Sequence, residues 1–330
     1  ATETMTNAIE AGIWTDPDGT VLYSDSSGRI RRIDPNTNLA TTVVGGTSIH
    51  DGNIATNSFV SNPRGLAVGR DGSVYIADMQ SDRIRRVDPN TLKIETVAGS
   101  GGRGYGGNGG PATEAYFLNP YDVDIDIEGR LVIADTLNAQ IRIVEHNGTI
   151  ASVAGTGTER ADRGDGGLAI SASFVTTHAV ACGPDGRIYV GDSAARIRVV
   201  DPSTGIISTF AGIGLSGYSG DGGYALEAQI GCPSSISLDP NGNVYFTDLT
   251  HHVVRKIDQD GIITTLAGTS SPGFSEDGKY AVKANLRNPM GITVSCDGQV
   301  YFSDSRNNCV RTIDTDGKLL TVVGNAKAGD

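Results

Sequence analysis

The stretch YSGDGGYALEAQI, residues 218–230, places an aspartate among three glycines and then continues into small apolar residues. A single copy would be compatible with a phosphate-binding turn, which needs a Gly-rich loop that leads into a helix, usually with a lysine. The chain instead carries five related loops at steps of 57, 57, 56 and 56 residues, and none has the Lys-Ser/Thr pair. We therefore interpret the stretch as part of a structural repeat. The loops are centred on Asp51, Asn108, Asp165, Asp221 and Asp277.

Two further landmarks keep the same period. The strings LYSD, YIAD, VIAD, YVGD, YFTD and YFSD each end in an aspartate, and an arginine follows six or seven residues later. Since every copy carries these groups, we expect structural roles for them: an aspartate that caps a loop and an ion pair that braces the repeat. The aspartates are Asp25, Asp78, Asp135, Asp192, Asp248 and Asp304, and the arginines are Arg31, Arg85, Arg142, Arg198, Arg255 and Arg311.

Each copy of about 56 residues contains four short segments rich in β-branched and aromatic residues. In the second copy these are residues 65–69, 73–78, 83–88 and 94–99, separated by turn residues. Four strands in each of six repeats, with no helical period between them, predict an all-β fold, a six-bladed β-propeller of four-stranded antiparallel blades. We expect one domain, 1–330, with blades of approximately 1–53, 54–110, 111–167, 168–223, 224–279 and 280–330.

The Asp-Gly stretch then has a structural task as the link between blades. It would run from the outermost strand of one blade to the innermost strand of the next. Its glycines permit positive φ angles, and its aspartate would bond to nearby backbone N–H groups and hold the turn. Each end blade has all four of its strands, so closure of the ring would rest on packing between the first and sixth blades.

The repeat unit, clearest at residues 220–268, resembles the NHL-repeat family of β-propellers over nearly all of the chain. The strings YFTD and YFSD also look like the YWTD propellers of receptor ectodomains, which have six blades too, but the GDGG link favours NHL. This resemblance implies the fold. It leaves the function open, because NHL-type propellers include protein-binding and RNA-binding modules, extracellular and sensor domains, and a metal-dependent lyase.

Composition narrows the classes of partner. The net charge is −12, with no basic block, which argues against nucleic acid, because nucleic-acid binding depends on Lys and Arg neutralising phosphates. No apolar run reaches the length of a membrane span, so direct membrane insertion is not expected. The cysteines contain no CxxC pair, and the sequence leaves open whether they form disulfides: Cys182, Cys232, Cys296 and Cys309.

Departures from the repeat point to one end of the central channel. The position before each innermost strand is expected to lie there, with Ala11 in the first blade and varied residues in the others. Only one histidine, His178, falls at this end, whereas a lyase-like zinc site would need several, so we assign no catalytic residue. The predicted ligand-binding residues are Arg64, Tyr121, Asp122, His178, Ser234 and Met290.

The third blade is unusual because YDVDIDIEG places three carboxylates on one face of its innermost strand. Asp122, Asp124 and Asp126 are therefore a candidate site for Ca²⁺ or another hard cation, with no other cofactor expected. The alternative interpretation, for these carboxylates and for the ligand-binding residues above, is that they are solvated polar groups lining the channel.

The sequence thus favours a non-catalytic scaffold or protein-binding module outside the cell, with a protein or glycan as partner, or a second copy of itself. One alternative is an enzyme that uses the channel mouth. Another is a self-assembling fibre or array, because the chain begins and ends in the same phase of the repeat. Asn147 begins an Asn-Gly-Thr acceptor for N-glycosylation, which favours a secreted protein.

Overall fold

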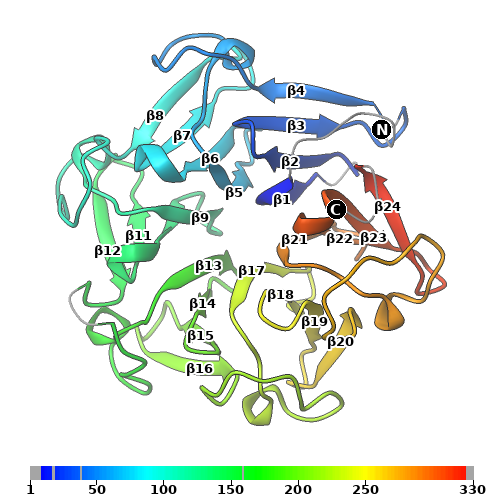
Figure 1. Cartoon of the computed structure of the whole chain (residues 1–330). Coiled ribbons are helices and arrows are strands. Elements are labelled where there is room, and N and C mark those ends of the chain that lie inside the picture. Colours follow the sequence, from blue (N-terminus) through cyan, green and yellow to red (C-terminus); the bar gives the residue numbers. More distant parts are fainter. Residues whose placement is uncertain (1–8, 17–18, 38, 158–159, 325–330) are drawn as a thin grey trace.

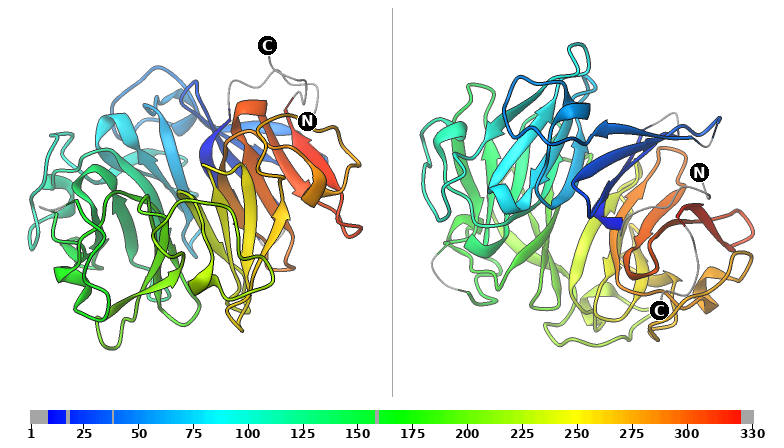
Figure 2. Two further views of the ribbon diagram at one scale, coloured as in Figure 1. Left: turned by 60° about the horizontal axis from the view of Figure 1, so that its bottom comes forward. Right: turned by 45° about the horizontal axis from the view of Figure 1, so that its top comes forward.

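The computed structural model describes residues 9–16, 19–37, 39–157 and 160–324. Within these ranges the strands form six four-stranded sheets arranged as blades around a central channel (Figure 1). Every sheet consists of four consecutive antiparallel strands, so the predicted six-bladed propeller is confirmed. Tilted views show the blades standing side by side around the ring (Figure 2).

The strands of each blade run in chain order from the channel to the outer rim. Blade 1 has β1 (Ile9–Thr15), β2 (Val21–Asp25), β3 (Arg29–Ile33) and β4 (Ala40–Val44). Blade 2 has β5 (Pro63–Val68), β6 (Val74–Asp78), β7 (Arg83–Val87) and β8 (Ile94–Ala98). Blade 3 has β9 (Pro120–Ile125), β10 (Leu131–Asp135), β11 (Gln140–Val144) and β12 (Ile150–Ala154).

The second half of the ring repeats this order. Blade 4 has β13 (Thr177–Cys182), β14 (Ile188–Asp192), β15 (Arg196–Val200) and β16 (Ile207–Ala211). Blade 5 has β17 (Pro233–Leu238), β18 (Val244–Asp248), β19 (Val253–Ile257) and β20 (Ile263–Ala267). Blade 6 has β21 (Pro289–Val294), β22 (Val300–Asp304), β23 (Cys309–Ile313) and β24 (Leu319–Val323).

The hydrophobic core lies between the faces of adjacent blades. One buried cluster combines Ile141 of blade 3 with Val190 of blade 4 and Phe174 of the link between them. Second strands such as β10, β14 and β18 are buried at every position, which explains their nearly continuous apolar sequences. Burial of both faces of a blade requires a neighbour on each side, and the closed ring supplies one.

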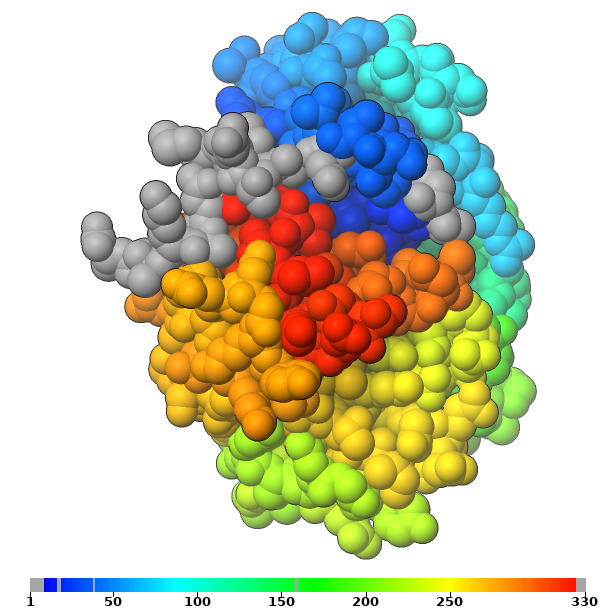
Figure 3. Space-filling view, turned by 90° about the vertical axis from the view of Figure 1, so that its right-hand side faces the viewer, coloured from blue at the N-terminus to red at the C-terminus, as the bar shows by residue number. Residues whose placement is uncertain are grey.

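Between the described parts of blades 1 and 6 the ring closes through side-chain contacts and without a shared strand, as the sequence predicts. Blades 1 and 6 share a buried cluster in which Ile9 and Tyr23 pack with Val310 and Val323. The strands β1 and β21 are in contact, but each stays hydrogen-bonded within its own sheet. Figure 3 shows the surfaces of these two blades meeting on one side of the molecule.

The path of the links between blades explains the recurring Asp-Gly stretch, of which residues 218–230 are one copy. Each of the five described links crosses to the outer rim of the next blade and pairs with its fourth strand before it turns in to the channel. In blade 4 the N–H of Gly166 donates to the carbonyl oxygen of Ile207 (2.8 Å), and the N–H of Ile207 donates to that of Gly167 (3.0 Å). Gly166 has a φ of +79°, which favours glycine. The link therefore covers the start of an edge strand that would otherwise be exposed.

After the glycines, each described link makes one short 3₁₀ turn. These turns are η1 (Ala55–Asn57), η3 (Ala112–Glu114), η5 (Ala169–Ser171), η6 (Ala225–Glu227) and η7 (Ala281–Lys283). Each begins with a fully buried alanine, which explains the small residues at fixed steps. Among the residues that the structure describes, no helix is long and apolar enough to cross a membrane. None of the four cysteines forms a disulfide.

Candidate functional site

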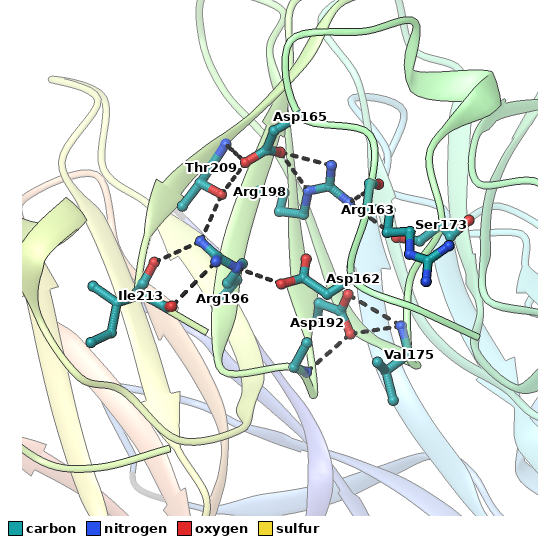
Figure 4. A network of polar contacts seen from close by, with 12 residues as sticks. Asp162, Arg163, Asp165, Ser173, Val175, Asp192, Arg196, Arg198, Thr209 and Ile213 are labelled. Atoms are coloured by element: carbon teal, nitrogen blue, oxygen red, sulfur yellow. Dashed lines mark hydrogen bonds and ion pairs between the residues drawn. The ribbon is translucent and has the colours of Figure 1, made fainter. Parts of the chain in front are cut away.

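A buried arginine in the third strand of a blade joins that blade to its link. Arg198 of β15 has no solvent exposure. Its Nε and Nη2 atoms donate to Oδ1 of Asp165 at 3.0 and 2.7 Å, and Nη1 donates to the carbonyl oxygens of Arg163 and Ser173 at 3.2 and 3.1 Å (Figure 4). The guanidinium also lies over the ring of Phe174, with Cζ 5.2 Å from its centroid.

Asp165 connects this arginine to the outer rim. Its Oδ2 atom accepts the backbone N–H of Thr209 in β16 at 3.1 Å, so one carboxylate ties the link to two strands. Burial raises the pKa of Asp165, but the hydrogen bonds from Thr209 and the charge of Arg198 outweigh it, and the pKa falls below its usual value. The aspartate of the Asp-Gly stretch therefore holds the next blade, and its hydrogen bonds go to the third and fourth strands of that blade rather than to the N–H groups of its own turn, where the sequence predicted them.

The same contact recurs around the ring, and it changes one sequence-based expectation. The strand-end aspartates do cap loops: Oδ1 of Asp135 accepts the backbone N–H of Leu118 at 2.9 Å. In blades 2–6, however, the arginine lies closer to the link residue, an aspartate or in blade 3 an asparagine, than to the strand-end aspartate, which is 3.6 Å away for Arg85. The pairs are Arg85–Asp51 at 2.6 Å, Arg142–Asn108 at 2.8 Å, Arg255–Asp221 at 2.6 Å and Arg311–Asp277 at 3.3 Å.

Blade 1 differs in its described contacts. Nη2 of Arg31 donates to the carbonyl oxygen of Ala40 at 3.0 Å. The corresponding strand-end residue, Asp25, accepts the N–H and hydroxyl of Ser27. The segments that would precede blade 1 in the ring, 325–330 and 1–8, lie outside the described residues.

Most of the predicted ligand-binding residues do meet at one end of the channel. We call this end, where the innermost strands begin, the first mouth. Arg64 of β5 pairs with Glu10 of β1 (2.5 Å) and lies over the ring of Tyr121 of β9, with Cζ 5.3 Å from its centroid. The rings of Tyr121 and His178 of β13 meet edge to face at 5.4 Å. The sulfur of Met290 of β21 is 4.0 Å from Nη1 of Arg64.

Two details of the first mouth were missed from the sequence. Glu10, not Ala11, stands level with Arg64, because β1 contains one extra residue between its pairings to β2. Ala11 is buried. Ser234 is buried as well, and its hydroxyl bonds to Thr247 (2.9 Å) and to the Met290 carbonyl oxygen (3.0 Å), so it points between blades 5 and 6.

Burial shifts the pKa values of three groups at the first mouth toward their neutral forms. Burial, with the nearby charge of Arg64, lowers the pKa of His178, and its Nδ1 lies 3.2 Å from the Thr176 hydroxyl. Burial raises the pKa of Tyr121 to about 12 and that of Cys232 to about 12. A protonated thiol is a weak nucleophile, so the chemistry of this mouth is hydrogen bonding and stacking.

The three carboxylates of blade 3 are engaged separately. Oδ2 of Asp122 accepts the N–H of Val180 (3.0 Å), and Oδ2 of Asp124 accepts that of Cys182 (2.7 Å). Both N–H groups lie on the free inner edge of β13, where they need an acceptor. Asp126 is buried and pairs with Arg130 of the following turn at 2.7 Å.

The hydrogen bonds and the ion pair of Asp122, Asp124 and Asp126 occupy the carboxylates that the sequence predicted as a cation site. Within the described ranges, no group of three or more His, Cys, Asp or Glu side chains is arranged to hold a metal ion. Blade 5 shows that the bonding to the neighbouring strand is a general device, because the hydroxyls of Ser235 and Ser237 accept the N–H groups of Ile292 and Val294, each at 3.2 Å. The carboxylates of Asp122 and Asp124 thus support the fold of the ring.

Burial shifts the protonation of these channel groups. The pKa of Asp122 is raised well above its usual value and that of Asp124 to about 6, in both cases mainly through burial. The central channel contains a cavity of about 210 Å³, lined by Asp122, Asp124, Ser235 and Ser237 among other residues. The side chains that meet at the first mouth do not line this cavity.

Several known proteins are similar in sequence to this chain. The family model of the teneurin NHL domain matches residues 213–276 and 273–329. The chain is 29% identical to SUPPRESSOR OF QUENCHING 1, chloroplastic, of Arabidopsis thaliana, over 84% of this chain and 28% of that protein. It is 25% identical to NHL repeat-containing protein 2 of Bos taurus (82% and 41%) and 27% identical to Teneurin-3 of Mus musculus (79% and 10%). The chain thus spans less than half the length of these relatives.

Solved structures share the fold at low identity. A protein of unknown function from Bacteroides thetaiotaomicron superposes with a TM-score of 0.68 at 17% identity, covering 97% of this chain and 71% of that one. A gluconolactonase from Xanthomonas campestris gives 0.61 at 13% (96% and 87%), and a chain of a nidogen–laminin complex gives 0.60 at 15% (94% and 92%). Since an enzyme and a binding module superpose about equally well, these structures carry the architecture alone.

Proposed function

Because this chain belongs to the NHL-repeat family of β-propellers, we propose that it is a non-catalytic scaffold module that binds a protein or glycan partner outside the cell. Its relatives include teneurins, and its fold neighbours include a chain of the nidogen–laminin complex. The interaction surface in this proposal is the outer rim of blades 4, 5 and 6.

The observation that carries the proposal is a set of exposed apolar side chains at one repeated position. The residue that follows the buried alanine of each described 3₁₀ turn in the links faces solvent, and in blades 4–6 it is Ile170, Leu226 or Val282, exposed by 50, 56 and 50%. In blades 2 and 3 the same position is threonine, Thr56 or Thr113. Two blades of the same propeller thus fold with a polar residue at this position, so folding does not require the apolar residue found in blades 4–6.

A second apolar residue adjoins each of these three. Leu168, Tyr224 and Tyr280 stand two positions earlier and are also more than half exposed. Tyr224 and Leu226 line a groove of about 400 Å³ between blades 4 and 5, together with Phe210 and Val199. Exposed apolar groups that gather around a hollow are typical of binding surfaces.

The test compares the rim with the first mouth. A rim variant carries Ile170→Thr, Leu226→Thr and Val282→Thr, which install the residue found in blades 2 and 3. The matched control is His178→Ala. Each protein, immobilised, is incubated with the extracellular fraction of the source organism, and the retained proteins and glycans are quantified.

The proposal expects a partner that the wild type and His178→Ala retain and that the rim variant loses at least tenfold. Loss in His178→Ala with retention in the rim variant would instead support an enzyme or ligand binder at the channel mouth. If the rim variant only changes the mass of the free chain from an oligomer to a monomer, measured by light scattering, the partner is a second copy.

A further inference from the structure

Three hollows meet at Trp14, the only tryptophan of the chain. The first is the channel cavity of about 210 Å³. The second, of about 390 Å³, lies at the opposite end of the channel from the first mouth; we call it the second mouth. The third is a groove of about 550 Å³ between blades 1 and 2, the blade 1–2 groove. Trp14 lines all three, and Arg70 and Val68 line the last two.

The groove arises from an exchange of residues that is confined to blade 1. Trp14 pairs across the sheet with Leu22. The corresponding pairs in blades 2, 4, 5 and 6 have a small or polar residue on the innermost strand and a tyrosine on the second strand: Ala67–Tyr75, Ala181–Tyr189, Ser237–Tyr245 and Thr293–Tyr301. Blade 3 has Asp124–Val132 at this place and no aromatic residue. Blade 1 therefore differs from the other five blades in having an aromatic side chain on the innermost strand at this pair.

The lining of the groove combines an apolar wall with cationic groups. Trp14, Val43 and Val74 are only half-buried in the core between the two blades, and one face of each borders the groove. Arg32 and Arg70 are exposed at its edges, against the single lining carboxylate of Asp16 among the described residues. In a chain with a net charge of −12, this local excess of positive charge favours an anion.

The position of Arg70 connects the groove to the second mouth. Its Nη2 atom donates to the carbonyl oxygen of Ile127 at 3.0 Å, across from blade 2 to blade 3. Arg70 and Trp14 both line the groove and the second mouth, and on its other side the second mouth is lined by the carboxylates of Asp124, Asp126 and Asp239. A guanidinium has five N–H donors, so a carboxylate can be bound by the same group without breaking the bond to Ile127.

We propose that the blade 1–2 groove binds a small organic anion that carries a flat apolar ring. The ring packs on Trp14 and the valines, and the carboxylate pairs with Arg70. A volume of about 550 Å³ suits such a molecule, and a mostly apolar lining with a few polar groups is typical of ligand sites. This site is separate from the first mouth and from the outer rim of blades 4–6.

The test uses 3-phenylpropionate as the anionic probe and 3-phenylpropanol as its neutral match. Trp14 is the only tryptophan, so its emission responds to a ligand in the groove or in the two adjoining hollows, and the variants below separate the groove from the others. We expect a saturable change in emission with 3-phenylpropionate, with a dissociation constant of about 1 mM for a probe of this size. Saturation-transfer NMR on the same samples checks that the phenyl ring contacts the protein.

Two variants test the geometry. Arg70→Ala should weaken 3-phenylpropionate about tenfold and leave 3-phenylpropanol unchanged, because one charge-assisted hydrogen bond is lost. Leu22→Tyr installs the tyrosine that blades 2, 4, 5 and 6 have at this position and should abolish binding of both probes. Arg187→Ala, which removes a charge from the groove between blades 4 and 5, is the control and should change nothing.

Unchanged binding in Leu22→Tyr, or equal binding of both probes with no effect of Arg70→Ala, overturns the proposal. Circular dichroism establishes that each variant is folded. Should Leu22→Tyr fail to fold, Arg70→Ala still decides, because Arg70 is exposed and its removal leaves the core intact.

Discussion

Replacing Arg198 with methionine removes the centre of the contact that ties blade 4 to its link. The variant loses both bonds to Asp165 and leaves the carbonyl oxygens of Arg163 and Ser173 without their donor. Breaking a fully buried ion pair typically costs about 3–5 kcal/mol. Asp165 is partly exposed and regains water, so most of the penalty comes from the two carbonyl oxygens, at about 1–2 kcal/mol each. We expect a loss of about 2–4 kcal/mol in the free energy of unfolding.

The chain itself supplies a control for this prediction. Blade 3 has Asn108 where blade 4 has Asp165, and the amide oxygen accepts the bond from Arg142 at 2.8 Å. Asp165→Asn should therefore cost about 1 kcal/mol or less, because a neutral acceptor replaces a charged one in the same place. Urea unfolding at pH 7, followed by circular dichroism, measures both variants. A loss below about 1 kcal/mol for Arg198→Met, or equal losses for the two variants, would refute the role assigned to this pair.

Three further perturbations test other parts of the structure. Burial raises the pKa of Asp192 to about 6, above the usual value of about 3.9 in an unfolded chain, so the folded state holds a proton that the unfolded state has released between about pH 4 and pH 6. The contribution of Asp192 to stability should therefore fall as the pH rises through this window. Urea unfolding at pH 4.5 and 6.5 should show that the free energy of unfolding depends less on pH in Asp192→Asn than in the wild type. An equal dependence in the two proteins would contradict the raised pKa. Gly12→Ala should cost at least about 2 kcal/mol, because its Cβ would overlap the Arg64 carbonyl oxygen and force two innermost strands apart; a melting temperature equal to wild type would argue against this close approach. Asn147 is exposed in the turn between β11 and β12, so secretion from a eukaryotic host should add a glycan that Asn147→Gln lacks, and an unmodified intact mass would exclude it.

The fold could be predicted because its signals are local and repeated. The period of about 56 residues, the four β-rich segments in each copy and the turn residues between them are all visible in the sequence. Closure without strand exchange also followed from the phase of the repeat, since blades 1 and 6 each contain four strands of their own.

The contacts between side chains that are distant in the sequence could not be predicted in the same way. The arginine of each blade was expected to pair with an aspartate six or seven residues away, but in blades 2–6 it lies closer to a link residue 33 or 34 positions earlier, which comes near only because the link runs along the rim. Asp122 and Asp124 looked like cation ligands because a sequence does not show which backbone N–H groups a neighbouring strand leaves open. Glu10 was missed because one extra residue in β1 shifts the alignment of blade 1.

The proposed role of the outer rim can be tested most directly by footprinting. The chain would be purified together with its natural partner, and the accessibility of its side chains to hydroxyl radicals compared with that of the free chain. We expect protection of Tyr224, Leu226 and Tyr280, with Tyr121 and His178 unchanged. Protection of Tyr121 and His178, with the rim as reactive as in the free chain, would contradict a scaffold that binds through its rim and would place recognition at the first mouth.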